Sequence, residues 1–356
     1  MRILYLGSSS GTSGHRAAAM ARLGHEVTLL DPYQALPAGR VVSPLLAQWN
    51  RYTGGLGLVE LARRWVLRQI DGAHFDLAWV DHGAMVGASL VRELKARIPR
   101  VLCYCIDDPF GGRDATLWRG FLGALPFYDL LVVVRTPNIE EAYAHGARKV
   151  MRVFMSADEV AHRPRALPAS DYEQWRSDVL FVGTAFPERG PFLADLVRLG
   201  VPLTLYGNRY DRLPEWRILK PYWRAADAST TDSYANAISA AKVCLGLLSR
   251  GNRDLHTTRS MEIPSLGRVL CAERTPEHSA LYDEDVEAVF WSNAQECAAQ
   301  CFDLLGDESR RQAIAEAGRA RFLKSPWRND QVVQDILTTV TGTTAERVRV
   351  EKAAGS

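Results

Sequence analysis

The sequence predicts an α/β protein with two Rossmann-like, doubly wound domains that face a central cleft. Short strands that are apolar on both faces alternate with helical patterns in both halves, which is typical of parallel sheets covered by helices. The alternation breaks at residues 157–176, which hold prolines and charged residues, and then restarts. A length of 356 residues also favours two domains over one. Ligands of such folds bind at the carboxyl ends of the strands, so the cleft is the expected site.

The first half opens with a β-loop-α-β unit and continues as strands that alternate with helices. The predicted strands are 2–6, 26–30, 77–80, 101–106, 130–134 and one near 150–154, and the predicted helices are 15–23, 57–70, 86–97, 115–123 and 137–145. Residues 34–56 lack clear periodicity and contain proline, glycine and aromatic residues, so we expect an irregular segment near the site.

The second half repeats the same alternation. Its predicted strands are 179–182, 203–206, 243–247, 269–271 and 288–291, and its predicted helices are 190–198, 231–240, 259–266, 293–305, 308–323 and 330–340. The expected division is a first domain at 1–160 on the acceptor side, a linker at 161–176, a donor-side domain at 177–325, a C-terminal helix at 326–341 that packs back on the first domain, and a solvated tail at 342–356.

Composition narrows the class of partner. Apolar residues make up 47% of the chain, charged residues 24%, and the net charge is +2, so we expect no nucleic-acid partner. No apolar run approaches the ~18 residues of a membrane span. The apolar run at Met1–Gly7 is too short for a signal peptide, and the six cysteines lack metal-site spacing. We therefore expect a cytoplasmic protein with buried thiols.

A first glycine loop, with Gly7, Gly11 and Gly14, follows a strand and opens a helix. Glycines let the backbone approach an anion, and a helix N-terminus favours negative charge. The spacing is not that of a dinucleotide fingerprint, although Asp31 ends the second strand. A loop that contacts a phosphate or an acceptor, with Gly11 at its centre, and a plain tight turn both remain open.

The most informative pattern lies in the second half. A strand ends at Gly183, a cation at Arg189 follows at a helix start, and further on Asp254 and Glu262 flank a second helix start with Arg259 between them. A glycine turn, a cation and a carboxylate at strand ends are the parts that hold a nucleoside diphosphate.

These motifs resemble the CgeB-like glycosyltransferases, a branch of the group-1 glycosyltransferases with the GT-B fold. The matching segments run in the family's order over about 145 residues: 178–189, 205–207, 234–248 and 258–267. The resemblance implies a hexosyltransferase-like enzyme of bacterial glycan or glycoconjugate synthesis. Its donor would be a nucleoside-diphosphate sugar and its acceptor a hydroxyl of unknown identity, with retention of configuration and without metal or other cofactor.

The resemblance also assigns residues. Glu262 takes the second position of a Glu-x7-Glu motif and would bind the ribose hydroxyls, and Asp254 replaces the first Glu, which contacts the sugar. Arg189 would bind the diphosphate with help from Arg259. The remaining donor-side candidates are Gly183, Tyr206, Gly207, His256 and Thr258. A helix-start carboxylate favoured by the helix dipole and solvated arginines are the bland alternatives.

Three residues of the first half are candidates because they follow strands. His82 lies where many GT-B enzymes carry a histidine near the donor sugar, and Asp107 or Asp108 could orient an acceptor hydroxyl or act as a base. A structural histidine and a helix-capping aspartate are the alternatives. The acidic triplet 283–285 precedes a strand instead of ending one, so no metal is expected there.

Two other functions remain open at this point. A sugar-nucleotide epimerase could use the same fold, with His82 and Asp107 as acid–base groups. A non-catalytic nucleotide-sugar-binding protein, of a surface or spore-coat type, could also retain it, and the Asp at position 254 is its one hint.

Overall fold

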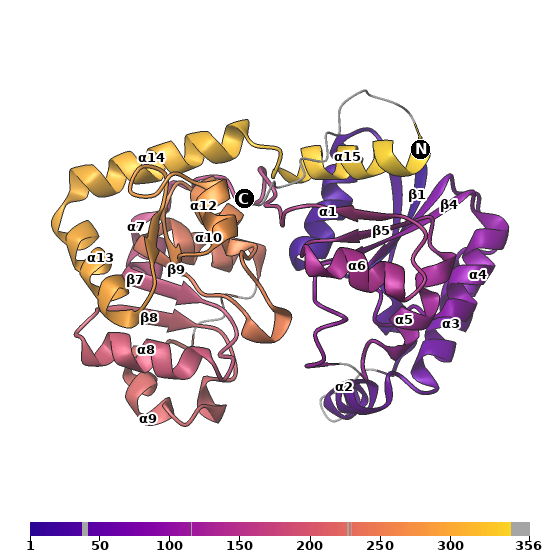
Figure 1. Cartoon of the computed structure of the whole chain (residues 1–356), viewed down its shortest axis with the longest axis horizontal. Coiled ribbons are helices and arrows are strands. Elements are labelled where there is room, and N and C mark those ends of the chain that lie inside the picture. Colours follow the sequence, from indigo (N-terminus) through magenta and orange to yellow (C-terminus); the bar gives the residue numbers. More distant parts are fainter. Residues whose placement is uncertain (38–41, 115, 226–227, 229, 343–356) are drawn as a thin grey trace.

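The computed structural model describes residues 1–37, 42–114, 116–225, 228 and 230–342. It contains two parallel sheets, each covered by helices, and the two domains lie side by side (Figure 1). The strand order is β2-β1-β3-β4-β5-β6 in the first domain and β11-β10-β9-β7-β8 in the second. In each sheet the chain adds its later strands on the other side of the first strand, so the strand order switches between β1 and β3 and between β7 and β9. Parallel sheets bind ligands at this switch point.

The first domain holds a six-stranded sheet whose four central strands are largely buried on both faces and whose two edge strands are only partly buried. Its strands are β1 (Arg2–Leu6), β2 (Glu26–Leu30), β3 (Leu77–Asp81), β4 (Arg100–Cys105), β5 (Leu130–Val133) and β6 (Val150–Arg152). Its helices are α1 (Gly11–Arg22), α2 (Val42–Thr53), α3 (Leu58–Gln69), α4 (Ala88–Arg97), α5 (Arg119–Ala124) and α6 (Pro137–Ala144).

The second domain repeats this layout around five strands. The strands are β7 (Ser177–Val182), β8 (Leu203–Tyr206), β9 (Ala241–Gly246), β10 (Val269–Glu273) and β11 (Val289–Trp291). The helices are α7 (Ala169–Trp175), α8 (Arg189–Arg198), α9 (Trp216–Leu219), α10 (Thr231–Ser239), α11 (Arg259–Ser265), α12 (Pro276–Leu281), α13 (Ala294–Gly306) and α14 (Glu308–Lys324).

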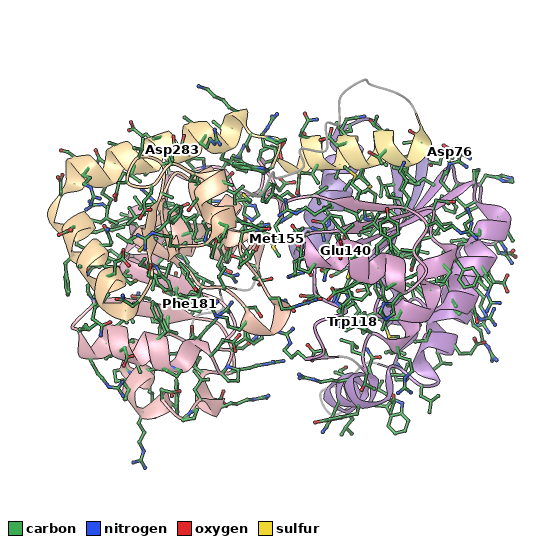
Figure 2. The ribbon with its side chains drawn as sticks, in the orientation of Figure 1. Asp76, Trp118, Glu140, Met155, Phe181 and Asp283 are labelled. Atoms are coloured by element: carbon green, nitrogen blue, oxygen red, sulfur yellow. The ribbon has the colours of Figure 1, made fainter. Side chains whose placement is uncertain are left out.

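The last helix, α15 (Asn329–Thr341), returns to the first domain and lies along α1 (Figure 1). Its apolar side chains, among them Val333 and Ile336, share one buried core with Ile3 and Tyr5 of β1. Because α14 belongs to the second domain and α15 to the first, the chain crosses between the domains twice. Met155, on the first crossing, lies between the two domains (Figure 2).

The parallel-sheet prediction is confirmed, and most predicted elements lie within a few residues of the observed ones. The irregular segment expected at 34–56 is wrong where the structure describes it: the segment holds the end of a short 3-10 helix at Pro32–Ala35 and all of α2, while residues 38–41 lie outside the described residues. Helix α7 forms within the predicted linker, and α9 and α12 were not predicted. Within the described residues, no helix is both long and apolar enough to cross a membrane. The predicted tail from 343 onward lies outside the described residues.

Candidate functional site

Loops at the carboxyl ends of both sheets enclose two neighbouring hollows between the domains, each of about 200 Å³. We call them the Glu262 pocket and the Asp254 pocket after the carboxylates that line them. Thr258 and Arg259, at the start of α11, line both pockets. The two predicted carboxylates therefore face adjacent parts of one interdomain cleft.

The Glu262 pocket is built around a carboxylate in the first turn of α11. Glu262 is 5% exposed, and its Oε2 accepts a hydrogen bond of 2.5 Å from the hydroxyl of Tyr234 on α10. Its Oε1 lies 3.8 Å from Nε2 of His162, whose Nδ1 accepts the backbone N–H of Asp158. Burial, together with the Glu262 charge, raises the pKa of Tyr234, so the tyrosine remains a donor. These neighbours hold the carboxylate in one orientation toward the pocket.

The wall opposite Glu262 comes from the first glycine loop. Gly11, with φ +59°, and Thr12 start α1 and line the pocket, so backbone N–H groups of a helix N-terminus open into it. A side chain at Gly14 would collide with the carbonyl oxygen of Ser9, at 2.5 Å, so the loop must stay tight. His15, on the same turn, contacts Thr231 Oγ1 at 3.0 Å and so joins the two domains.

The two predicted cations differ in their surroundings. Arg189 is 5% exposed, and its guanidinium donates to the carbonyl oxygens of Leu248, Thr184 and Leu247 at 2.8–3.0 Å. Burial, with the nearby Arg259, lowers the pKa of Arg189 to about 10. Arg189 therefore braces the loops after β7 and β9, and its diphosphate role stays a prediction. Arg259 is only partly buried, donates once to a carbonyl oxygen and lines both pockets.

The predicted glycines form one tight contact below Arg259. A side chain at Gly207, whose φ is +123°, would lie 2.2 Å from the carbonyl oxygen of Gly183. A side chain at Gly183 would lie 3.1 Å from Nη2 of Arg259. Both glycines let two loops and the guanidinium stack closely. Tyr206, another predicted donor-side residue, is fully buried in the core against Trp175 and lines neither pocket.

The second carboxylate, Asp254, lies in a buried ion pair between the domains. It is 6% exposed and accepts from Nε and Nη2 of Arg135, which follows β5 in the first domain and is 4% exposed. Arg135 also donates to the carbonyl oxygen of Ile106 at 2.8 Å. Burial raises the pKa of Asp254 although the arginine opposes that shift. The expected free sugar-contacting carboxylate is thus already paired, and sequence spacing held no sign of Arg135.

His82 and Asp107 are brought together at the first-domain side of the cleft. Nε2 of His82 lies 2.9 Å from Oδ2 of Asp107, and Asn252 of the second domain donates to Oδ1 at 2.9 Å. Burial opposes ionisation of Asp107, but the hydrogen bonds from His82 and Asn252 prevail and lower its pKa to about 2. Asp107 lines the Asp254 pocket. It is therefore an ionised carboxylate with donors on both oxygens.

Two other candidates serve the domain contact. Asp108 accepts from Nε and Nη2 of Arg253 at 2.5 and 2.9 Å, across the domains. His256 is 1% exposed, accepts the backbone N–H of Met155 at 2.9 Å and contacts Glu277 through Nδ1. Both ring nitrogens of His256 are therefore engaged within the protein and it lines neither pocket, so its contact with a ligand stays a prediction.

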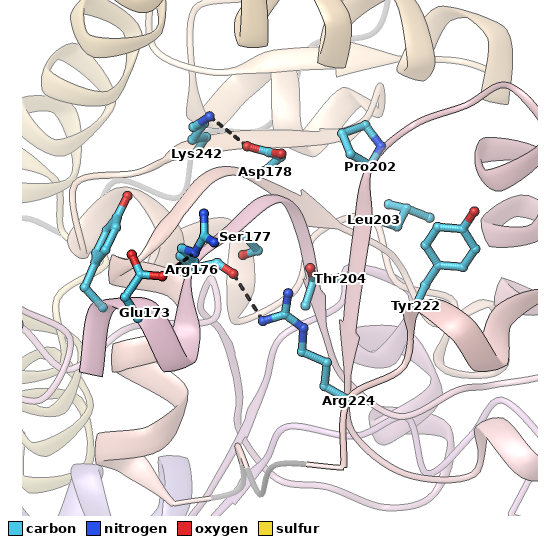
Figure 3. Close-up of a pocket in the computed structure, with 11 residues that line it drawn as sticks. Glu173, Arg176, Ser177, Asp178, Pro202, Leu203, Thr204, Tyr222, Arg224 and Lys242 are labelled. Carbon is cyan, nitrogen blue, oxygen red and sulfur yellow. Dashed lines mark hydrogen bonds and ion pairs between the residues drawn. The ribbon is translucent and has the colours of Figure 1, made fainter. Parts of the chain in front are cut away.

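A larger hollow, of about 580 Å³, lies away from the cleft at the amino ends of β7, β8 and β9 (Figure 3). Its charged side chains mostly pair with one another: Lys242 with Asp178 at 2.7 Å, and Arg176 with Glu173 at 2.8 Å. None of the predicted site residues lines it. Size alone therefore does not identify the site, because parallel sheets bind ligands at the opposite, carboxyl end.

The two-domain architecture defines the class of fold. Sucrose-phosphate synthase from Thermosynechococcus elongatus superposes with a TM-score of 0.69 at 12% identity, covering 97% of this chain and all of that one. HepE from Anabaena, in complex with UDP and glucose, matches with a TM-score of 0.63 at 15% identity, covering 96% of this chain and all of that one. The chain therefore has the GT-B fold of glycosyltransferases.

A family comparison agrees with the fold. The model of a family described as glycosyl transferase-like matches residues 189–338, from the start of α8 into α15. This segment contains Arg189, Asp254, Arg259 and Glu262. A trehalose-phosphate synthase from Burkholderia xenovorans, in complex with glucose-6-phosphate, also shares the fold, with a TM-score of 0.60 at 12% identity over 95% of this chain and 99% of that one. No curated protein matches the sequence.

Proposed function

We propose that this protein is a glycosyltransferase that moves a sugar from a nucleoside-diphosphate sugar to an acceptor hydroxyl. The observation that carries the proposal is the Glu262 pocket. There an oriented carboxylate, a partly free guanidinium of Arg259 and the N-terminus of α1 surround one interdomain hollow. These are the groups that a ribose and a diphosphate require. The CgeB-like branch, retention of configuration and independence from metal are parts of the same proposal.

The proposed reaction follows from the charges of the site. Glu262 accepts hydrogen bonds from the two ribose hydroxyls, and Arg259 and the N-terminal amides of α1 face the diphosphate. Negative charge grows on the diphosphate as the glycosidic bond breaks, and fixed donors stabilise it best where water is excluded. The sugar would then lie toward the Asp254 pocket. In a retaining reaction the leaving phosphate can take the acceptor proton, so no protein base is required.

A second candidate, epimerisation of the donor sugar, is favoured by the His82–Asp107 pair beside the cleft. Both groups could shuttle a proton at a sugar carbon. The two functions differ in products. A transferase releases nucleoside diphosphate, whereas this alternative changes the sugar nucleotide without an acceptor.

The test is a panel of UDP-, GDP- and dTDP-sugars, with calorimetric binding and release of nucleoside diphosphate as readouts. We expect one nucleotide series to bind and Glu262→Gln to weaken that binding by about tenfold to 100-fold, because charge-assisted hydrogen bonds to two hydroxyls are weakened. Glu308→Gln, at the exposed first turn of α14, is the matched control and should bind like the wild type. Absence of binding by every nucleotide, or equal binding by Glu262→Gln, contradicts the proposal.

A further inference from the structure

Three cysteine side chains meet in the core of the second domain. Cys271 lies on β10, and Cys297 and Cys301 lie one turn apart on α13, so the two helical thiols share one side of that helix. Helix α13 packs on the sheet that contains β10, and this brings all three sulfur atoms within 4.8 Å of one another. All three residues are 0% exposed. We call them the cysteine cluster.

The surroundings of the cysteine cluster are apolar. On its strand, Cys271 pairs with Leu245 of β9 and Val289 of β11, and all three cysteines belong to one hydrophobic core. Among the residues that the structure describes, no histidine, aspartate or glutamate joins the three sulfurs as a fourth side-chain ligand. A metal ion placed between them would therefore have sulfur as its side-chain ligands.

The separation of the sulfur atoms fits a metal ion that three thiolates bind. Metal–sulfur bonds of about 2.3 Å place three sulfurs around one ion about 4 Å apart. The sulfurs of the cysteine cluster reach that separation with little movement, since no distance between them exceeds 4.8 Å. The backbone of β10 and α13 can therefore stay in place when an ion binds.

The protonation of the cysteine cluster also favours a cation. Hydrogen bonds from Cys271 and Cys297 lower the pKa of Cys301, although burial opposes its ionisation. Hydrogen bonds with the two other thiols and burial raise the pKa of Cys271. The thiolate is the form of cysteine that binds metals. One of the three side chains is thus held in its metal-binding form by the other two, in a core where a thiolate without a cation is unfavourable.

We propose that the cysteine cluster binds a soft metal ion, Cu(I), that joins β10 to α13. Thiolates select Cu(I), zinc or iron–sulfur clusters. Structural zinc takes four protein ligands and an iron–sulfur cluster takes four cysteines, whereas Cu(I) is stable with fewer ligands. None of the three cysteines lines either pocket of the cleft, so the ion stabilises the second domain and takes no part in the proposed transfer.

The first test measures the metal content of the full chain. The protein is produced in copper-supplemented cells, purified without oxygen and treated with bathocuproine disulfonate, a chelator of Cu(I). We expect stoichiometric copper to remain bound and X-ray absorption to show sulfur as its neighbours. Cys301→Ala should lose the copper. The matched control is Cys244→Ala, which removes a buried thiol of the same sheet that packs in a different core, and it should retain copper like the wild type.

The second test is anaerobic urea unfolding with and without buffered Cu(I). An ion that binds the folded chain shifts the folding equilibrium about 100-fold when its free concentration is about 100 times its Kd. The urea midpoint of the wild type and of Cys244→Ala should therefore rise with Cu(I), and that of Cys301→Ala should not. A wild type without copper or with zinc in its place, a midpoint that Cu(I) does not move, or a disulfide within the cluster overturns the proposal, and these wild-type results decide even if Cys301→Ala fails to fold. Since neither test uses a sugar nucleotide, failure of the proposed transferase activity remains a separate result.

Discussion

The Glu262 pocket and the Asp254 pocket use the same kinds of residue for different ends. In the first, the carboxylate is held by a tyrosine hydroxyl and faces a histidine ring at 3.8 Å, and it lines the hollow. In the second, the carboxylate of Asp254 forms an ion pair with the buried Arg135 of the opposite domain. The segment from the end of β9 into α11 thus supplies both a carboxylate that lines a pocket and an ion pair between the two domains. The comparison teaches that two carboxylates eight residues apart, Asp254 and Glu262, need not share a role.

The largest expected effect comes from breaking the ion pair between Arg135 and Asp254. Arg135→Ala leaves Asp254 buried without a cation, which costs about 3–5 kcal/mol for a buried pair. Urea unfolding should show this loss. The double variant Arg135→Ala/Asp254→Ala is the control, and it should recover much of the stability because no charge is left unpaired. A loss of free energy of unfolding below about 1 kcal/mol for the single variant would instead be typical of a solvated pair. Asp254 would then be as open to solvent as a pocket-lining carboxylate, and the contrast between the two pockets would be lost.

A smaller effect should separate the two arginines. Arg259→Gln should weaken binding of a nucleoside diphosphate about tenfold while leaving that of the nucleoside nearly unchanged, since a charge-assisted contact to phosphate is lost. Arg189→Gln should instead lower the free energy of unfolding by about 1–3 kcal/mol, because buried carbonyl oxygens lose their donor. Calorimetry and urea unfolding of both variants measure this. The reverse pattern would restore Arg189 as the main diphosphate ligand.

The sequence was sufficient to predict the two parallel sheets because their central strands are apolar on both faces, as in Leu77–Asp81 and Leu203–Tyr206. It failed at α2, whose exposed face is apolar, so that its pattern contradicts the usual burial. It also failed at Arg135 and His162, because each meets its partner only across the folded chain: Arg135 is 119 residues from Asp254, and His162 is 100 residues from Glu262. Spacing identifies residues on one element, such as Arg259 and Glu262, but not partners brought together by domain packing.

At acid pH the contact between the two domains should weaken. Burial opposes ionisation of Asp107, but His82 of the same domain and Asn252 of the second domain lower its pKa to about 2. Burial likewise opposes ionisation of Asp108, and Arg253 of the second domain lowers its pKa. A carboxylate whose pKa is lowered by folding stabilises the protein above its unfolded pKa, near 4, and that stability is lost as the pH falls toward 2. Asp254, with a raised pKa, works in the opposite direction but stands alone against these two.

Urea unfolding at pH 6, 4.5 and 3 should therefore show a falling midpoint. Asp107→Asn should flatten this slope, because the group that titrates is gone. Asp107 is 37% exposed as a side chain, so solvent screening reduces its share to roughly 1 kcal/mol. If the variant keeps the full slope, the lowered pKa of Asp107 is not coupled to folding. The Arg135–Asp254 pair would then be the ionic contact of the Asp254 pocket that stabilises the packing of the two domains. The difference between the two pockets would depend on that single ion pair.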